Sequence, residues 1–385
     1  MADFRKALLI LSIFGVFAAG FLTGAYYTAH KENEELTLKY KKAALSKKRS
    51  TDKKLPEAEI SKVIMGYVQD FRDPASTNYK NLTHVIFSFA HPTTDGKVML
   101  NGEMAWENLR RTVKLAHKNG SSALLAIGGW YHINGGESYP YFKEAISSPQ
   151  SRNNLVASLM AIVDKENLDG IDIDFEHPRS QTDAANLAVF AKELSGELHG
   201  RKKELSVAVY SKINAISGAE VNSVTFKADM FRYADHVNIM AYDGQWDGGY
   251  HAENLAPYQF TKNVVNYWAK LFGSLGISKS KLVLGIPLYG QPEDVKAKQI
   301  SYAAIVRKNP DYAKKDSINW NGTVYHFNGQ NTVKRKTELA LSHGFGGMML
   351  WEAGLDSNDE KNMAAAIRST LTTHSIRAGN SPGEN

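Results

Sequence analysis

Residues 168–176 read LDGIDIDFE, and apolar and acidic side chains alternate along the last six of them. Successive side chains of a β-strand point to opposite faces, so Asp172, Asp174 and Glu176 share one face and the apolar residues share the other. A solvent-facing acidic edge strand is the alternative interpretation. Unpaired carboxyl groups inside a protein are costly, so three on one inward face favour a functional site over a structural one.

On both sides of this strand, short β-rich segments alternate with longer segments of helical period. Eight segments are predicted strands: 63–68, 84–89, 123–128, 170–175, 205–210, 236–241, 282–288 and 347–350. The predicted helices are 102–118, 151–166, 183–198, 259–271, 331–342 and 359–370. An open doubly wound sheet usually has fewer strands and a Gly-rich phosphate turn after the first, and no such turn follows Val68. We therefore predict an α/β fold, a closed (β/α)8 TIM barrel, with Glu176 at a strand's carboxyl end, where such barrels carry catalytic groups.

The acidic face is suited to acid catalysis. Neighbouring carboxyl groups disfavour each other's ionisation, so at least one should keep its proton near neutral pH. Glu176, at the mouth, is the predicted proton donor, and Asp174 is placed to share a proton with it. A Mg²⁺ or Mn²⁺ site is the competing interpretation, but no histidine shares this face and His177 should point the opposite way. We expect no metal ion and no cofactor.

The composition is that of a folded globular protein, with 43% apolar and 22% charged residues. The formal charge of +6 arises largely from residues 31–54. Basic residues do not interleave with aromatic ones along any groove-like element, so we do not expect nucleic-acid binding. The sequence contains no cysteine, which excludes disulfides, thiolate metal sites and cysteine nucleophiles.

Residues 7–29 form an uncharged apolar run that is long enough to cross a bilayer as a helix. The predicted organisation is a membrane anchor at 1–30, a charged stalk at 31–59, the barrel at 60–372 and a flexible tail at 373–385. We expect a monomer tethered to the inner membrane of a cell envelope, with the barrel outside the cytoplasm. Signal cleavage and secretion are the alternative. The basic stalk opposes export, because positive charge favours the cytoplasmic side.

The acidic strand resembles the signature D-G-x-D-x-D-x-E of glycoside hydrolase family 18, which is complete here from Asp169 to Glu176. Three further segments are similar to motifs of that family in the same order: AIGGW at 126–130, MAYD at 240–243 and GIPLYG at 285–290. The resemblance implies a chitinase-like enzyme that hydrolyses β-1,4-linked N-acetylglucosamine polymers, either chitin or chito-oligosaccharides. Action on peptidoglycan or N-glycan cores, and sugar binding without catalysis, are the alternatives.

The resemblance also implies roles for individual residues. Glu176 would act as acid and then as base, Asp174 would hold the substrate's acetamido nitrogen and relay charge, and Asp172 would set the protonation of Asp174. Tyr242 would hydrogen-bond the acetamido carbonyl oxygen as that oxygen attacks the anomeric carbon, in a substrate-assisted retaining route. Residues implied to line the sugar site are Tyr67, Phe87, Gly129, Trp130, Met240, Asp243, Tyr289 and Trp351, and Trp246 is a further indole to consider.

Two departures from the family pattern bear on this chemistry. Ala126 stands where the family usually has a serine, which removes a hydroxyl group near the lower carboxyl groups. The stretch 291–345 is short for the α+β subdomain that deepens the cleft in many members. We therefore predict a barrel without the full insertion, a shallow groove and endo-type cleavage.

Overall fold

The computed structural model describes residues 62–379. The predicted anchor at 7–29 and the predicted stalk at 31–59 lie outside the described residues. Within 62–379, no helix is both long enough and apolar enough to cross a membrane.

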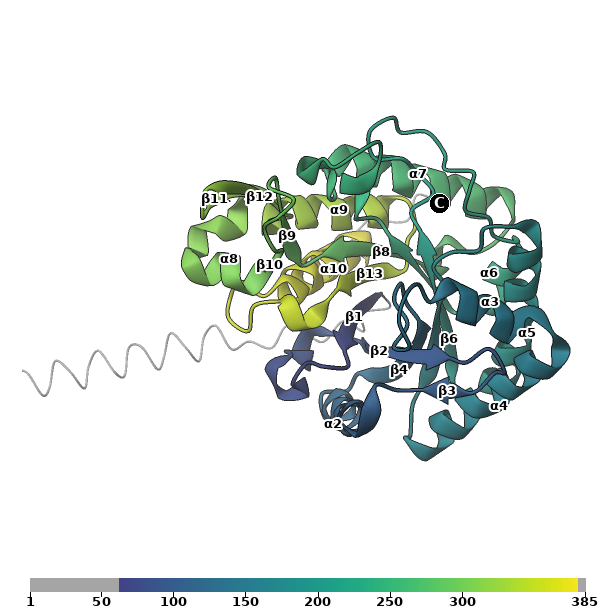
Figure 1. Cartoon of the computed structure of the whole chain (residues 1–385). Coiled ribbons are helices and arrows are strands. Elements are labelled where there is room, and N and C mark those ends of the chain that lie inside the picture. Colours follow the sequence, from purple (N-terminus) through teal and green to yellow (C-terminus); the bar gives the residue numbers. More distant parts are fainter. Residues whose placement is uncertain (1–61, 380–385) are drawn as a thin grey trace, which may run out of the picture. The chain divides into compact units, whose positions relative to one another are not determined.

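Parallel strands close into a barrel (Figure 1). They are β1 (Val63–Gln69), β2 (His84–Pro92), β4 (Ser122–Gly128), β5 (Gly170–Asp174), β6 (Glu204–Tyr210), β7 (His236–Met240), β8 (Leu282–Pro287) and β13 (Gly347–Trp351). Each strand pairs with the next in this order, and β1 pairs with both β2 and β13, which closes the ring. A short strand, β3 (Val98–Met99), pairs antiparallel with the end of β2. Every barrel strand coincides with a predicted one, so the predicted TIM barrel is confirmed.

Helices cover the outside of the ring (Figure 1). They are α2 (Gly102–Lys118), α3 (Tyr139–Ser147), α4 (Pro149–Lys165), α5 (Gln181–Gly200), α6 (Met230–Tyr233), α7 (Tyr258–Ser274), α9 (Gln330–Ser342) and α10 (Met363–Gly379). Local signals set their ends: α4 begins where the Ser148 hydroxyl accepts a hydrogen bond from the backbone N–H of Ser151, with a proline in the first turn. The helix α10 continues to Gly379, so the predicted flexible tail begins as helix.

Short 3₁₀ helices occur in the loops. They are η1 (Pro74–Ser76), η2 (Tyr79–Asn81), η3 (Gly244–Trp246), η4 (Ala252–Asn254), η5 (Lys279–Lys281), η6 (Pro310–Lys314) and η7 (Ala353–Leu355). Among them η3 and η4 follow β7, at the carboxyl end of the barrel.

Apolar packing is concentrated between the strands and the helices, where the largest buried side chains include Trp268 and Phe190. Inside the ring the packing is mixed. A small apolar cluster contains Met65, Ile86 and Leu124, among others. Buried polar side chains share that interior, among them Asp172, Ser206 and Asn238. Barrel interiors are normally filled by branched apolar residues, so this polar interior indicates a functional role.

A compact α+β insertion lies between β8 and β13. It consists of the strands β9 (Tyr289–Pro292), β10 (Ile300–Ser301), β11 (Ser317–Trp320) and β12 (Thr323–His326), in the order β10-β9-β12-β11, and the helix α8 (Tyr302–Lys308). The prediction that this stretch is too short for an α+β subdomain is therefore wrong. Strands of two to four residues allow a four-stranded sheet to fit in a segment that had seemed too short.

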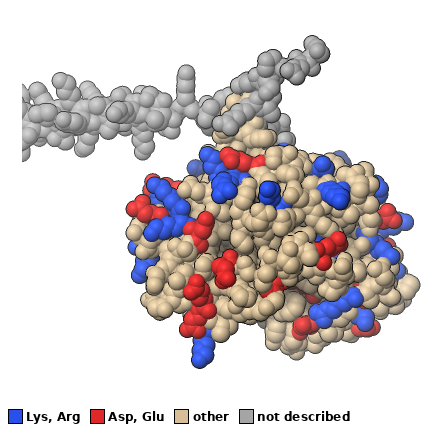
Figure 2. All heavy atoms as spheres, turned by 90° about the horizontal axis from the view of Figure 1, so that it is seen from above, with Lys and Arg blue, Asp and Glu red and all other residues tan. Residues whose placement is uncertain are grey.

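On the face shown in Figure 2, basic and acidic side chains are interspersed. No continuous basic patch is visible on that face among the described residues. The charge pattern there does not resemble the single-sign surface of nucleic-acid-binding domains.

Candidate active site

A cleft of about 1030 Å³ lies at the carboxyl ends of the barrel strands. The predicted site residues that line it are Tyr67, Trp130, Asp174, Glu176, Met240, Tyr242, Asp243 and Trp351. They come from β1, β5, β7 and β13 and from the loops after β4, β5 and β7. The fold thus brings together residues that are nearly 300 positions apart in the sequence.

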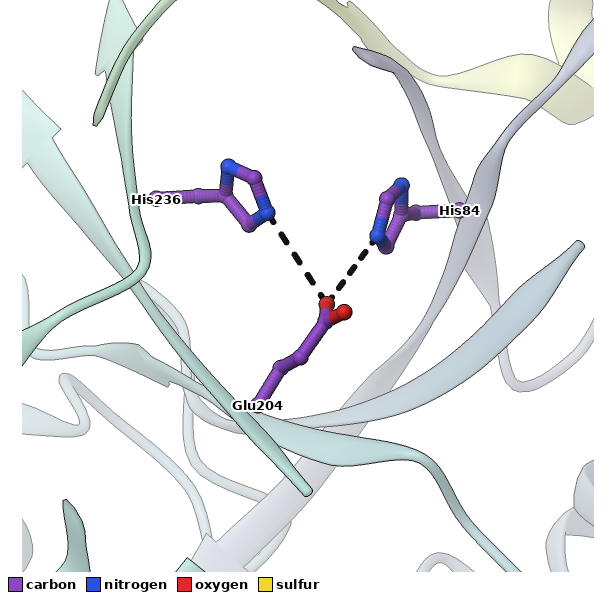
Figure 3. Close-up of side chains that lie close together, drawn as sticks. All are labelled: His84, Glu204 and His236. Carbon is purple, nitrogen blue, oxygen red and sulfur yellow. Dashed lines mark hydrogen bonds and ion pairs between the residues drawn. The ribbon is translucent and has the colours of Figure 1, made fainter. Parts of the chain in front are cut away.

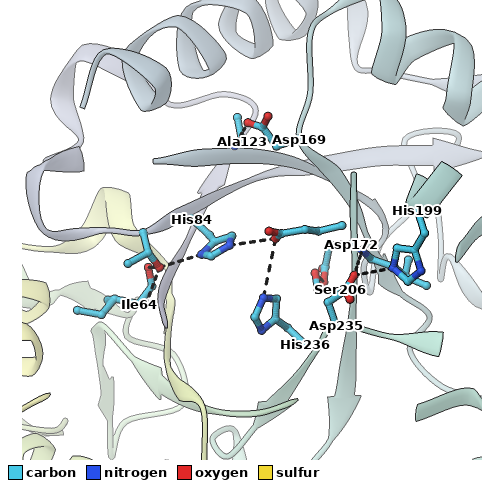
Figure 4. Close-up of polar contacts among 12 residues, drawn as sticks. Ile64, His84, Ala123, Asp169, Asp172, His199, Ser206, Asp235 and His236 are labelled. Atoms are coloured by element: carbon cyan, nitrogen blue, oxygen red, sulfur yellow. Dashed lines mark hydrogen bonds and ion pairs between the residues drawn. The ribbon is translucent and has the colours of Figure 1, made fainter. Parts of the chain in front are cut away.

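Asp172 lies below the cleft floor and is completely buried. Its Oδ2 accepts a hydrogen bond from the Tyr67 hydroxyl at 2.7 Å. Its Oδ1 accepts hydrogen bonds from the Ser206 hydroxyl (Figure 4) and from Asn238 Nδ2, the latter at 3.2 Å. Burial raises the pKa of Asp172 to about 6, although these three donors favour its charged form.

Asp174 lies one pleat above Asp172, and its Oδ1 is buried without a hydrogen-bond partner. Burial, followed by the nearby Glu176 and Asp172 carboxyl groups, raises the pKa of Asp174 well above its usual range. Its backbone oxygen accepts a hydrogen bond from Gly129 N at 2.8 Å, which ties the strand end to the loop after β4. A buried oxygen without a partner is unusual and marks a place where a ligand donor fits.

Glu176 follows the end of β5 and is partly exposed to the cleft. Burial, with a further contribution from the Asp243 carboxylate, raises the pKa of Glu176 to about 8. The side chain is therefore largely protonated at neutral pH and can donate a proton to a group in the cleft. No direct hydrogen bond joins Glu176 to Asp174 among the described residues, and the sharing of a proton between them stays a prediction.

The residues after β7 form the side of the cleft next to β8. Tyr242 fits against β8 because Gly285 has no side chain, and a Cβ there would lie 2.8 Å from the Tyr242 ring. The Asp243 carboxylate accepts a hydrogen bond from the Tyr289 hydroxyl at 2.5 Å and another from Gln245 Nε2 at 3.1 Å. Tyr289 is itself buried and reaches the site through this hydrogen bond rather than by lining the cleft.

Three indole rings, those of Trp130, Trp246 and Trp351, line the cleft. Trp351 packs against Tyr67, with ring centroids 5.5 Å apart, and against Phe89, at 5.8 Å. Trp130 is 52% exposed and Trp246 is 60% exposed, although both line the cleft. Large exposed aromatic side chains in a cleft are suited to stacking on apolar faces of a ligand.

Besides Asp172 and Tyr289, the predicted residues Phe87 and Gly129 do not line the cleft. Phe87 pairs in register with Val68, on the outer face of the strands, and packs in the cluster between strands and helices. Phe89, two residues later and within an irregularity of β2, packs against the cleft residue Trp351 instead. Gly129 lies under the Phe89 ring, where a Cβ would come within 2.8 Å, so its role is to allow close packing.

His177 contradicts the prediction made from side-chain parity. It lines the cleft, and its ring lies 4.9 Å from that of Tyr210 and 6.4 Å from that of Trp130, measured between centroids. The parity rule fails because β5 ends at Asp174, and the alternation of faces does not continue beyond a strand.

Other lining residues were not predicted from the sequence. They are Arg179, Ala208, Tyr210, Val221, Ser223, Val224, Asp247 and Met349. Most lie in the loops after β5, β6 and β7, which carry no strand period, so no local signal identifies them. Ser206 and Asn238, which hold Asp172, do follow the inward parity of β6 and β7 and could have been found from it.

The insertion contacts the cleft indirectly. The Tyr250 hydroxyl donates a hydrogen bond to the backbone oxygen of Pro292 on β9 and accepts one from Gln291 Nε2 at 2.7 Å. The Tyr250 ring in turn lies 4.9 Å from the ring of Trp246. None of the described residues of the insertion is among those that line the cleft. The insertion therefore supports Trp246 from behind.

Comparisons with known proteins agree with this geometry. The sequence model of "Glycosyl hydrolases family 18" matches residues 63–356. A chitinase-like effector of Moniliophthora roreri is 29% identical over 273 residues, covering 66% of this chain and 64% of that protein. Probable chitinase 10 of Drosophila melanogaster is 26% identical over 337 residues, covering 73% of this chain and 14% of that protein. The chain thus spans less than two thirds of the length of these relatives.

Similarity of fold extends to solved structures. The GH18 chitinase ChiB from the chitin utilization locus of Flavobacterium johnsoniae superposes with a TM-score of 0.66 at 24% identity. The superposition covers 81% of this chain and 94% of the chitinase. At this level of identity the likeness establishes the barrel fold. Because the family match spans well over half of the sequence and includes the acidic strand, the chain belongs to glycosyl hydrolases family 18.

Proposed function

We propose that this protein hydrolyses β-1,4-linked N-acetylglucosamine polymers, chitin or chito-oligosaccharides, with Glu176 as general acid and base. The observation that carries the proposal is the pairing of two carboxyl groups with different surroundings. Glu176 faces the open cleft and its pKa is raised to about 8, whereas Asp174 is buried beneath it with one oxygen unpaired. In enzymes that cleave glycosidic bonds by acid catalysis, two carboxyl groups typically lie in different surroundings, so that one donates a proton and the other stabilises charge.

In the proposed reaction Glu176 donates its proton to the glycosidic oxygen as the bond from that oxygen to the anomeric carbon breaks. The substrate's acetamido oxygen forms a bond to the anomeric carbon from the opposite face, which gives an oxazolinium ion. Water then attacks the anomeric carbon, its proton passes to Glu176 and the ring opens. Two inversions at one carbon leave its configuration retained, and no protein nucleophile is required.

Asp174 and Tyr242 are proposed to bind the acetamido group. The unpaired Asp174 Oδ1 can accept a hydrogen bond from the acetamido N–H, and this contact favours the charged form of Asp174. The negative charge stabilises the positive charge that develops on the acetamido group. The Tyr242 hydroxyl has only a 3.8 Å contact with the sulfur of Met349, so it remains able to donate to the acetamido oxygen.

Replacement of the proton donor tests the proposal. Glu176→Gln should reduce turnover of chito-oligosaccharides by about 10²-fold or more, since it removes the proton but keeps the shape, and sugar binding should remain. Glu197→Gln is a matched control, because Glu197 on α5 forms an exposed ion pair with Arg201, which follows the helix. Wild-type-like turnover by Glu176→Gln would refute the assignment.

The same assay identifies the substrate class. The full-length protein is incubated with chito-oligosaccharides, peptidoglycan fragments and N-glycans, and the products are analysed by mass spectrometry. Hydrolysis of peptidoglycan or N-glycans alone would replace the proposed polymer, and binding without hydrolysis would indicate a lectin. Equal cleavage of a substrate with a hydroxyl in place of the 2-acetamido group would exclude the substrate-assisted route.

We further propose that residues 7–29 hold the barrel at the outer face of an inner membrane, where polymers of this class are found. The length and apolarity of that run support the proposal. A reporter fused after Asn385 distinguishes the two sides of the membrane, and activity confined to the cytoplasm would refute it.

A further inference from the structure

Three potential metal ligands meet at the amino-terminal end of the barrel, away from the cleft. His84, Glu204 and His236 are the first residues of β2, β6 and β7, and their side chains converge inside the ring (Figure 3). One ligand atom from each lies within 4.8 Å of the others. Nothing in the proposed hydrolysis uses these side chains.

The distances within this cluster are close to those of a metal site. Glu204 Oε2 lies 3.0 Å from His84 Nε2 and 3.8 Å from His236 Nε2. In a tetrahedral Zn²⁺ site with bonds of about 2.0–2.2 Å, neighbouring ligand atoms lie roughly 3.3–3.5 Å apart. The two histidine nitrogens lie within 4.8 Å of each other, so side-chain rotations that move them closer together would bring all three ligands onto one ion.

The environment of each histidine leaves a nitrogen available. His84 Nδ1 lies 2.8 Å from the Thr83 hydroxyl oxygen, and that hydroxyl lies 3.2 Å from the Ile64 carbonyl, to which it can donate. A proton on His84 Nδ1 then leaves the Nε2 lone pair directed at the cluster, which is the arrangement found around metal-bound histidines (Figure 4). The other ring, His236, has a buried Nδ1 without a partner and only the 3.8 Å contact at Nε2.

We propose that His84, Glu204 and His236 bind one divalent transition-metal ion, with Zn²⁺ as the chemical type. Two imidazoles and one carboxylate are ligands that Zn²⁺ accepts, and the fourth position can be taken by water because the Glu204 side chain is 38% exposed. The ion would link three strands that are not all neighbours in the barrel. Its role would be structural, since the proposed proton donor lies at the opposite end of the strands.

A hydrogen-bonded His–Glu pair with a neighbouring imidazole is the simpler interpretation. That interpretation explains the 3.0 Å contact of His84. It does not explain why His236 Nε2 is turned toward the same oxygen at 3.8 Å, beyond hydrogen-bond distance. A shared ion would account for the orientation of both Nε2 atoms, while His236 Nδ1 would remain without a partner among the described residues.

The test is metal titration of the full-length protein after dialysis against a chelator. We expect one Zn²⁺ per chain by calorimetry, visible absorption typical of tetrahedral Co²⁺ with that ion as probe, and a higher melting temperature with metal than without. Glu204→Gln and His236→Gln should each lower the affinity by at least about 10²-fold and abolish the metal-dependent rise in melting temperature.

The control variant is His117→Gln. His117 forms a comparable pair with Asp169, at 2.7 Å, but no third ligand is grouped with it among the described residues. This variant should bind metal like the wild type. Failure of the wild type to bind one ion at micromolar concentration would overturn the proposal. So would equal binding by wild type, Glu204→Gln and His236→Gln, and both results would leave the proposed hydrolysis untouched.

Discussion

At Asp172 two neighbouring strands provide different side chains. Ala126 on β4 and Ser206 on β6 both pair in register with it, and only the serine can donate a hydrogen bond. The family pattern places a hydroxyl group on β4, at the position of Ala126. In this protein Ser206 on β6 provides a hydroxyl group from the other side of Asp172. Ser206→Ala should lower kcat about tenfold, because a hydrogen bond to a charged group stabilises it by about 1.5–3 kcal/mol and its loss favours protonated Asp172.

A second variant separates this positioning role from simple damage to the core. In the Ser206→Ala background, Ala126→Ser should restore part of kcat and return the acidic limb of the pH–rate profile toward that of the wild type. Ala126→Ser alone should have little effect. If the two substitutions act independently in the double-mutant cycle, Ser206 does not act through Asp172.

The pH dependence of turnover follows from the state of Glu176. Donation requires the protonated form, and its pKa is raised to about 8, so activity should fall about tenfold per pH unit above that value. The Asp243 carboxylate contributes to the raised pKa, so Asp243→Asn should move the alkaline limb to lower pH. Rates with chito-oligosaccharides measured between about pH 4 and 10 check this. An alkaline limb that stays in place in Asp243→Asn would contradict it.

At the scale of the element, the insertion between β8 and β13 supports one side of the cleft without forming a wall of it. It braces Tyr250 and, through that ring, Trp246, but its own residues do not line the cleft. We therefore keep the prediction of non-processive, endo-type cleavage, because a chain held by few walls is released after each cut. The mean chain length of a soluble polymer should fall early. Early accumulation of dimer while the polymer remains long would contradict the prediction.

Elements were predictable where their signals were local. The strands follow from runs of β-formers, and the proton donor follows from the alternation between Ile171 and Glu176. Phe87 was predicted to line the site because the resemblance identified its strand but not which face each residue occupies. In the structure Phe87 pairs in register with Val68, on the outer face of the strands. The sheet of the insertion was missed because its strands are too short to show a period.

At the scale of the whole molecule, the sites depend on contacts between distant segments. His84 and Glu204 are 120 positions apart, so no spacing rule would have associated them before the barrel brought β2 and β6 into the same ring. The residues that hold Asp172 come from β1, β6 and β7 for the same reason. Because the ring is closed, these inward-facing residues meet in two clusters, one around Asp172 and one formed by His84, Glu204 and His236.

The strand β6 contributes Glu204 to the cluster with His84 and His236. Two residues later, it contributes Ser206 to the hydrogen bonds of Asp172. Deletion of a single residue before this pair would turn both side chains toward the helices at once. A substitution at Glu204 or at Ser206 affects only one of the two clusters. A change in the length of β6 affects both. Length variation among descendants of this gene is therefore expected in loops and in the insertion, and the central strands should diverge by substitution alone.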